Sequence, residues 1–126
     1  MENIENDVLT IENGVLTKCK EDAVNVVIPE GVTEIGEGVF VKCDSLKSVV
    51  FPSSIKLIDD NTFFECNSLS SMVIPEGLSK IGNNAFQNCT ALDTIVFDGK
   101  LSQWEEEVKK GTDWNKNVPA KVAHCK

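Results

Sequence analysis

Residues 26–32 read VVIPEGV, and residues 72–78 repeat this phrase almost letter for letter as MVIPEGL. Midway between them, residues 49–55 read VVFPSSI, a more diverged copy. The central prolines of the three phrases are therefore separated by equal steps of 23 residues. Equal spacing of one apolar–proline–turn phrase predicts a chain built from repeated structural units.

Further positions keep the same 23-residue step, and most of them are apolar. They are Ile35, Ile58 and Ile81; Phe40, Phe63 and Phe86; Cys43, Cys66 and Cys89; and Leu46, Leu69 and Leu92. A fixed step of about 20–29 residues with leucine-like positions is typical of a leucine-rich-repeat solenoid. One unit cannot bury its own apolar face, so neighbouring units must stack and equivalent side chains must form columns. We expect about four such repeats over residues 20–100.

Within a repeat, the residues before the proline alternate as they do in a β-strand with one buried face. In residues 46–51, LKSVVF, this alternation places Val49 and Phe51 inward and Ser48 and Val50 outward. A second inward pair follows the proline, and then a short loop or helical turn carries the inward phenylalanine. The expected fold class is an α/β solenoid, a short right-handed leucine-rich-repeat superhelix with a parallel β-sheet on one face.

The two ends of the repeat array carry their own signals. Residues 8–11 and 15–17 flank Asn13-Gly14, a pair that favours the type I′ turn of a β-hairpin. We expect residues 1–19 to form an N-terminal hairpin cap that shields the open edge of the first repeat.

At the other end, Ser102 followed by Glu105 is a capping-box signature, and it predicts a helix that Gly111 terminates. The expected docking face of this helix consists of Leu101, Trp104 and Val108. Residues 101–126 are therefore predicted to form a C-terminal cap of helix and strand, and residues 1–126 a single leucine-rich-repeat domain.

The pattern IPxxVxxIGxxAFxxCxxLxxI resembles the BspA-type leucine-rich repeats of bacterial and some protist surface proteins. Residues 74–95 fit nearly every position of it, whereas the preceding repeat has Asp59 for the glycine and Thr62 for the alanine. Residues 13–18 and 111–115 are also similar to the terminal segments of that family. The resemblance implies a non-enzymatic recognition protein that is secreted or displayed on a cell surface.

Charge and hydropathy narrow the range of partners. The formal net charge is −8, and all basic residues are lysines, so the basic stripe of a nucleic-acid-binding protein is missing. No apolar run approaches the roughly 18–20 residues of a membrane span, so we expect no membrane insertion. The acidic start, MENIENDVLTIENG, does not have the layout of a secretory signal, and the location therefore stays open.

The five cysteines are an odd number and cannot all pair within one chain. Steps of 23 residues do not supply the close pairs that metal clusters need. We expect Cys43, Cys66 and Cys89 to be buried structural thiols, with disulfides or a metal between stacked repeats as the alternatives. Cys19 is less determined, and Cys125, next to the end of the chain, could be exposed and reactive.

The sequence offers few candidate catalytic residues. The single histidine, His124, would have to serve any Ser–His–Asp or Cys–His arrangement. Asp59-Asp60 resembles a calcium or general-acid pair, but turn chemistry explains it better. There is no glycine-rich phosphate loop. We expect no enzyme activity, no catalytic residues, no cofactor and no metal.

The outward side of the strands is the remaining candidate for function. Small polar and β-branched side chains follow one another there in register: Asn25, Val27, Ser48, Val50, Ser71, Val73, Thr94 and Val96. The family resemblance implies that this face binds a protein partner of a host or neighbouring cell, with a glycan as the alternative ligand. β-propensity filling a solvated sheet would produce the same stripe. The competing role is purely structural, as a segment of a larger surface protein or an intracellular scaffold.

Overall fold

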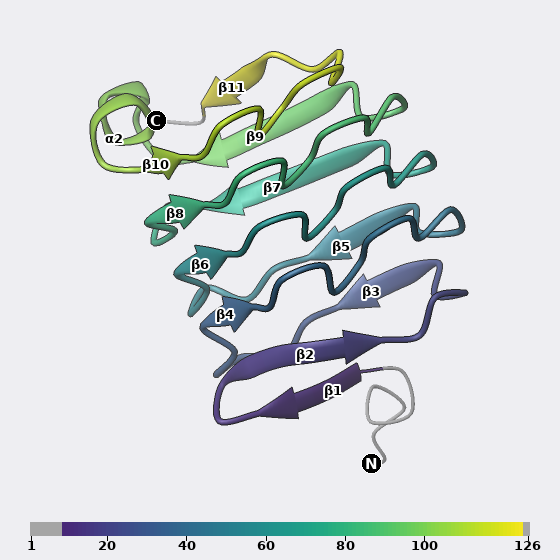
Figure 1. Cartoon of the computed structure of the whole chain (residues 1–126). Coiled ribbons are helices and arrows are strands. Elements are labelled where there is room, and N and C mark those ends of the chain that lie inside the picture. Colours follow the sequence, from purple (N-terminus) through teal and green to yellow (C-terminus); the bar gives the residue numbers. More distant parts are fainter. Residues whose placement is uncertain (1–8, 125–126) are drawn as a thin grey trace.

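The computed structural model describes residues 9–124, which wind into stacked coils with strands on two opposite faces (Figure 1). One face is a six-stranded sheet in the order β1-β2-β4-β6-β8-β10, and the other holds a two-stranded sheet, β3-β5, and a three-stranded sheet, β11-β9-β7. The strands are β1 (Leu9–Glu12), β2 (Val15–Cys19), β3 (Asn25–Val27), β4 (Glu34–Ile35), β5 (Ser48–Val50), β6 (Leu57–Ile58), β7 (Ser71–Pro75), β8 (Lys80–Ile81), β9 (Thr94–Asp98), β10 (Lys109–Lys110) and β11 (Val122–His124).

The 23-residue step is the pairing register of the parallel strands. Ile35 pairs with Ile58, and Ile58 with Ile81, along the face that holds β4, β6 and β8. On the opposite face Val26 pairs with Val49, and Met72 with Ile95. The solenoid is confirmed, but the prediction of a sheet on one face was incomplete, because the two-residue extended segments after each proline also stack.

The predicted column of aromatic rings is present in the core. Phe40, Phe63 and Phe86 are fully buried, with ring centroids 4.9 and 5.0 Å apart and interplanar angles of 3° and 6°. Trp114 continues the column edge-on, 6.1 Å from Phe86. Offset stacking of this kind adds to the burial of apolar area, so the rings hold adjacent coils in register.

The phenylalanine-bearing segments are turns that stack through the backbone. The amide of Phe40 donates to the carbonyl of Thr62 at 2.8 Å, and the amide of Phe63 donates to the carbonyl of Ala85 at 2.7 Å. Each turn holds two residues at positive φ, for example Asn84 at 58° and Asn88 at 65°. The predicted α/β character is not confirmed, because the one α-helix of the described residues, α2 (Leu101–Glu106), lies outside these turns.

An antiparallel hairpin of β1 and β2 lies at the N-terminal end of the stack. Asn13 and Gly14 have φ values of 53° and 80°, as the predicted type I′ turn requires. The second strand also pairs in parallel with β4, which joins the hairpin to the first coil. Val8, which the sequence assigns to the first strand, lies outside the described residues.

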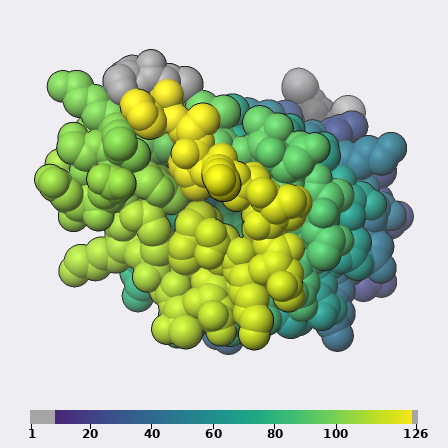
Figure 2. Space-filling view, turned by 90° about the horizontal axis from the view of Figure 1, so that it is seen from above, coloured from purple at the N-terminus to yellow at the C-terminus, as the bar shows by residue number. Residues whose placement is uncertain are grey.

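The register continues beyond residue 100 with an offset. Lys109 pairs with Lys80, a separation of 29 residues, which is six more than the repeat. Helix α2 has six residues and accounts for the difference. The segment after residue 100 lies across the C-terminal end of the stack (Figure 2), where Trp104 packs against Phe97 at 5.3 Å and against Trp114 at 5.6 Å.

The details of the predicted helix were wrong. The N-cap is Lys100, whose amide donates to the side chain of Gln103 at 2.7 Å, so the Ser102–Glu105 capping box does not form. Leu101 is 44% exposed and does not share the buried face of Trp104 and Val108. The helix ends well before Gly111.

Gly111 instead packs on the preceding coil, where a Cβ atom on it would lie 2.6 Å or less from the backbone of Gly82 and Asn83. The chain reaches this position in extended form through β10, because Lys110 holds the segment against the helix. Its ammonium donates to the carbonyls of Trp104 and Val108 and lies 4.4 Å from the centre of the Trp104 ring.

Candidate protein-binding face

The structure brings the predicted site residues together on the outward side of β3, β5, β7 and β9. In the ladder, Asn25 pairs with Ser48, Val27 with Val50, Ser71 with Thr94, and Val73 with Val96. Between them the inward residues of the same strands are buried, as the alternation predicts.

The valines are the main apolar component of this face. Val27, Val50 and Val73 are 56%, 55% and 56% exposed. Val96 is only partly exposed, and Ala123 of β11 pairs with it on the far side. The polar neighbours also connect the strands, since the Ser48 hydroxyl donates to the Asn25 side-chain oxygen at 2.7 Å. The face is therefore an apolar stripe beside a hydrogen-bonded polar stripe.

The strand face is not one continuous sheet. Strand β5 pairs with β3, and β7 pairs with β9, but β5 and β7 belong to different sheets. A backbone bond from the Ser70 amide to the Lys47 carbonyl, at 3.4 Å, links the two repeats beside the break. The opposite face pairs without interruption from β4 to β10. The break therefore affects only the face that carries the candidate site.

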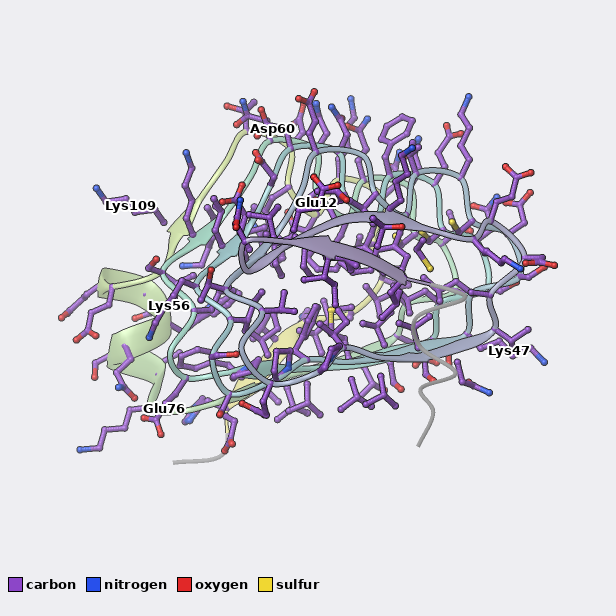
Figure 3. All side chains as sticks on the ribbon, turned by 90° about the horizontal axis from the view of Figure 1, so that it is seen from below. Glu12, Lys47, Lys56, Asp60, Glu76 and Lys109 are labelled. Atoms are coloured by element: carbon purple, nitrogen blue, oxygen red, sulfur yellow. The ribbon has the colours of Figure 1, made fainter. Side chains whose placement is uncertain are left out.

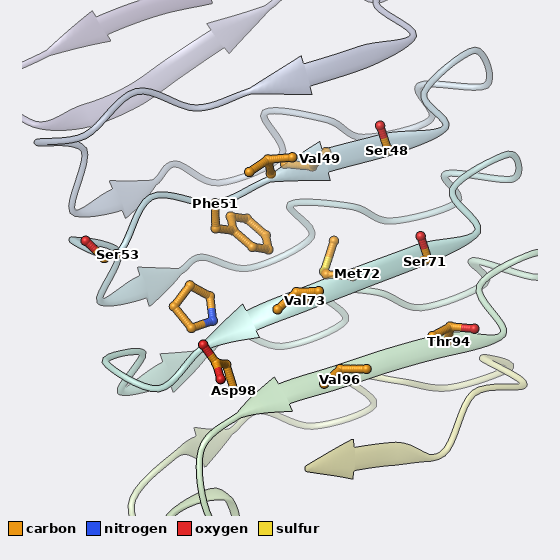
Figure 4. A pocket seen from close by; sticks show the side chains of 12 residues that line it. Ser48, Val49, Phe51, Ser53, Ser71, Met72, Val73, Thr94, Val96 and Asp98 are labelled. Atoms are coloured by element: carbon orange, nitrogen blue, oxygen red, sulfur yellow. The ribbon is translucent and has the colours of Figure 1, made fainter. Parts of the chain in front are cut away.

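An open hollow of about 550 Å³ lies over β5, β7 and β9 (Figure 4). Six of the predicted residues line it: Ser48, Val50, Ser71, Val73, Thr94 and Val96. Asn25 and Val27, on β3, are not part of it. Its lining also includes Val49, Phe51, Ser53, Met72, Pro75 and Asp98, which sequence reasoning did not assign to the site.

Asp98 is the one charged residue in this lining. It is exposed at the end of β9, where it pairs with Pro75 of β7. The sequence carries a signal for it, because Asp98 occupies the place where the 23-residue step would put a fourth proline. Other charged side chains, such as Lys47, Lys56 and Glu76, project outward around the periphery of the coils (Figure 3).

Cys43, Cys66 and Cys89 form a buried column of free thiols, and Cys19 is a partly buried free thiol outside that column. The Cys66 thiol donates to the Phe40 carbonyl at 2.9 Å, and the Cys89 thiol donates to the Phe63 carbonyl at 3.0 Å. Each of these thiols thus bonds to the turn of the preceding coil. The adjacent Cys89 thiol and burial raise the pKa of Cys66, and burial raises the pKa of the half-buried Cys19 to about 11. With pKa values raised in this way, Cys66 and Cys19 are protonated at neutral pH. Cys125 lies outside the described residues.

Residues 9–124 contain no group of three histidine, cysteine, aspartate or glutamate side chains placed to hold a metal ion. Asp59 and Asp60 serve the turns, because the Asp59 carboxylate accepts the Asp60 amide and the Asp60 carboxylate accepts the Asn83 amide, both at 2.8 Å. His124 is exposed on β11. Among the described helices, none has the length and apolar character needed to cross a bilayer.

Comparison with known proteins establishes the class. The family described as BspA type leucine rich repeat region matches residues 2–115, in six copies, so the chain belongs to this family. No curated protein matches the chain.

Solved structures give the same fold. A leucine rich cell surface protein from Faecalibacterium prausnitzii A2-165 is 40% identical over 61% of this chain and 20% of its own, with a TM-score of 0.59. A leucine-rich repeat protein from Eubacterium ventriosum ATCC 27560 is 26% identical over 78% of this chain and 29% of its own, with a TM-score of 0.59.

A third structure, a leucine-rich repeat protein from Bacteroides ovatus ATCC 8483, is 21% identical over 98% of this chain and 37% of its own, with a TM-score of 0.56, and it supports the fold alone. The chain therefore spans between about a fifth and two fifths of the length of these structures.

Proposed function

We propose that this chain is a non-enzymatic recognition module that binds a protein partner through the strand face of β3, β5, β7 and β9. The observation that carries the proposal is the line of valines, three of them more than half exposed, beside a hollow on the same face. An apolar surface that is contiguous, in register and rimmed by polar groups is typical of an interaction site. The opposite face does not present an equivalent stripe, since Leu57 of β6 is followed there by Lys80 and Lys109.

The kind of partner follows from charge and from the family. A net charge of −8 opposes binding to nucleic acid and to anionic membranes. The 40% identical structure is described as a cell surface protein, which supports a role in attachment to a protein of a host or a neighbouring cell. The match to the BspA-type repeat family and the likeness to solved leucine-rich repeat proteins support a non-enzymatic role.

A second role, as a structural segment, is favoured by the length comparison. The chain spans a fifth to two fifths of the related structures, so its repeats could extend a longer array without a ligand of their own. The two roles differ in whether the strand face captures a partner.

The test uses two double variants with the same change in charge. Val50→Lys/Val73→Lys alters the strand face, and Ile11→Lys/Val41→Lys places two lysines at exposed apolar positions elsewhere. Partners captured from epithelial and bacterial surface extracts are identified by mass spectrometry, purified, and titrated calorimetrically against wild type and both variants. We expect the strand-face variant to lose at least tenfold in affinity and the control to stay within twofold, with similar unfolding midpoints. Equal binding by both variants would refute the strand-face role and leave the structural one.

A further inference from the structure

The break between β5 and β7 makes one part of the strand face different from the rest. Elsewhere on this face adjacent strands share a ladder, β3 with β5, β7 with β9, and β9 with β11. At the break, the facing edges of β5 and β7 share no ladder within residues 9–124. The hollow extends over this break and over the β7–β9 pair, and Figure 4 shows Phe51 and Met72 among the side chains that line it.

The walls and ends of the hollow have different chemistry. Val50 and Val73 stand exposed on either side of the break, and Phe51 and Met72 are buried side chains that the hollow reaches. At the end where β9 finishes, Asp98 places a carboxylate beside Pro75. At the other end the lining residues themselves are uncharged (Ser48, Ser71 and Thr94), and the Thr94 hydroxyl donates to the Asp93 carboxylate at 3.0 Å. The hollow is thus apolar in the middle, and its one charged lining residue, Asp98, lies at the end where β9 finishes.

The volume, the apolar lining and the carboxylate of the hollow indicate which kind of ligand would fit it. A volume of about 550 Å³ is within the range of ligand pockets, which are mostly apolar and orient their ligand with a few polar groups. Interface anchors are large side chains that fill such depressions. This chain has no tyrosine or arginine, and both of its tryptophans pack together in the C-terminal segment. The anchor must therefore come from the partner, and the carboxylate of Asp98 favours a cation beside it.

We propose that the hollow receives an extended segment of the protein partner, in which a large aliphatic or aromatic side chain lies between Val50 and Val73 and a nearby lysine or arginine faces Asp98. This inference rests on the proposed function and specifies the chemistry of the partner. An acidic segment is disfavoured by Asp98 and by the net charge of −8. A glycan would leave the apolar middle without a matching group.

The experiment uses a phage-displayed library of random dodecapeptides as the probe. The library is selected on the wild-type chain after depletion on the Val50→Lys/Val73→Lys variant, and enriched peptides are synthesised and titrated by fluorescence anisotropy. Asp98→Asn is the test variant. Asp93→Asn is its matched control, because Asp93 is exposed just before the other end of β9 and the change in charge is the same.

We expect the enriched peptides to combine a large apolar residue with a lysine or arginine a few positions away. Asp98→Asn should weaken them about three- to fivefold at 50 mM NaCl and less at 500 mM, because an exposed charge pair is screened by salt. Asp93→Asn should change affinity by less than twofold.

The experiment distinguishes failure of this inference from failure of the proposed function. Peptides that bind the strand face without a cation, and equally to both aspartate variants, would overturn this inference while the proposed function stands. Peptides that bind the depleted variant as well as wild type would count against both. A library that yields no binder, or a glycan array that yields ligands sensitive to Val73→Lys, would refute a peptide segment as the occupant.

Discussion

Replacing Phe63 with leucine tests whether stacked rings, rather than burial alone, hold the coils together. Phe63 and Phe40 are both fully buried, so Phe→Leu removes a similar amount of buried apolar surface at either position. The two differ in their ring contacts within the described residues. Phe63 meets Phe40, Phe86 and Phe51, at 4.9, 5.0 and 6.1 Å, whereas Phe40 meets Phe63 alone.

Each aromatic pair is worth about 0.5–1.5 kcal/mol beyond burial. The two additional pairs of Phe63 predict that Phe63→Leu lowers the free energy of unfolding by about 1–3 kcal/mol more than Phe40→Leu. With an m-value of about 1–3 kcal/mol per molar urea, a difference near 2 kcal/mol separates the two midpoints by roughly 1 M.

The assay is urea unfolding followed by far-ultraviolet circular dichroism and by tryptophan fluorescence. Trp114 contacts Phe86 rather than Phe63, so the reporter survives both substitutions. Phe64→Leu is the control, because Phe64 is only partly buried and lies beside the column in sequence; it should cost less than about 0.5 kcal/mol. If Phe63→Leu is no more destabilising than Phe40→Leu, ring stacking does not contribute to coil register.

Three further changes have expected outcomes. Gly82→Ala should lower the free energy of unfolding in urea by about 1–3 kcal/mol, because its Cβ would lie 2.5 Å from the backbone of the preceding coil. At Gly77 the nearest atom to an added Cβ is the Lys56 ammonium at 3.2 Å, and the nearest backbone atom is 3.6 Å away, so Gly77→Ala should be nearly neutral; equal costs would contradict this packing. The pKa of Cys19 is about 11 in the folded chain, raised mainly by burial from about 9, so unfolded chains ionise first and the unfolding midpoint should fall as pH rises from 9 to 11. Cys19→Ala should show a smaller fall, and an identical fall would exclude this thiol as the cause. Gln103→Ala should lower the free energy of unfolding by about 1 kcal/mol, because it removes the acceptor of the helix N-cap amide. Ser102→Ala should have no measurable effect; a larger loss for Ser102→Ala than for Gln103→Ala would instead support the Ser102–Glu105 capping box predicted from the sequence.

Much of the fold was predictable because the 23-residue repeat shows which residues of successive coils are equivalent. Once Phe40, Phe63 and Phe86 are recognised as equivalent, stacking is the only way for each coil to bury its ring, and the parallel register follows. The strand alternation that placed Val49 inward and Val50 outward is equally local. The type I′ turn at Asn13 and Gly14 also needed only two residues, since both tolerate positive φ.

Other features were hidden because they depend on how segments meet. The second sheet face arises from two-residue strands, which are too short to show any alternation in sequence. The six-residue helix α2 shifts the register from 23 to 29, and after that insertion Lys109 and Gly111 no longer align by simple counting. Ser102 looks like a helix cap, but the N-cap is Lys100, whose amide donates to the Gln103 side chain, so the helix begins at Leu101.

The candidate site also has a part that the sequence predicted and a part that only the structure showed. The eight predicted residues do lie on one face, because alternation and the repeat together determine which side chains are outward and aligned. Asp98 and Met72 join the site only in three dimensions, since they line a hollow shared by β5, β7 and β9, and no local pattern shows that side chains of three separate strands meet there.

The amino-acid sequence by itself determined the period, the inward columns and the outward valine stripe, because these follow from the spacing of side chains along a regularly coiled backbone. The tertiary structure alone decided where the strand face opens, where the extra helix inserts and which charge borders the hollow. These depend on contacts between coils, and such contacts are set by the fit of neighbouring surfaces rather than by the order of residues within either coil.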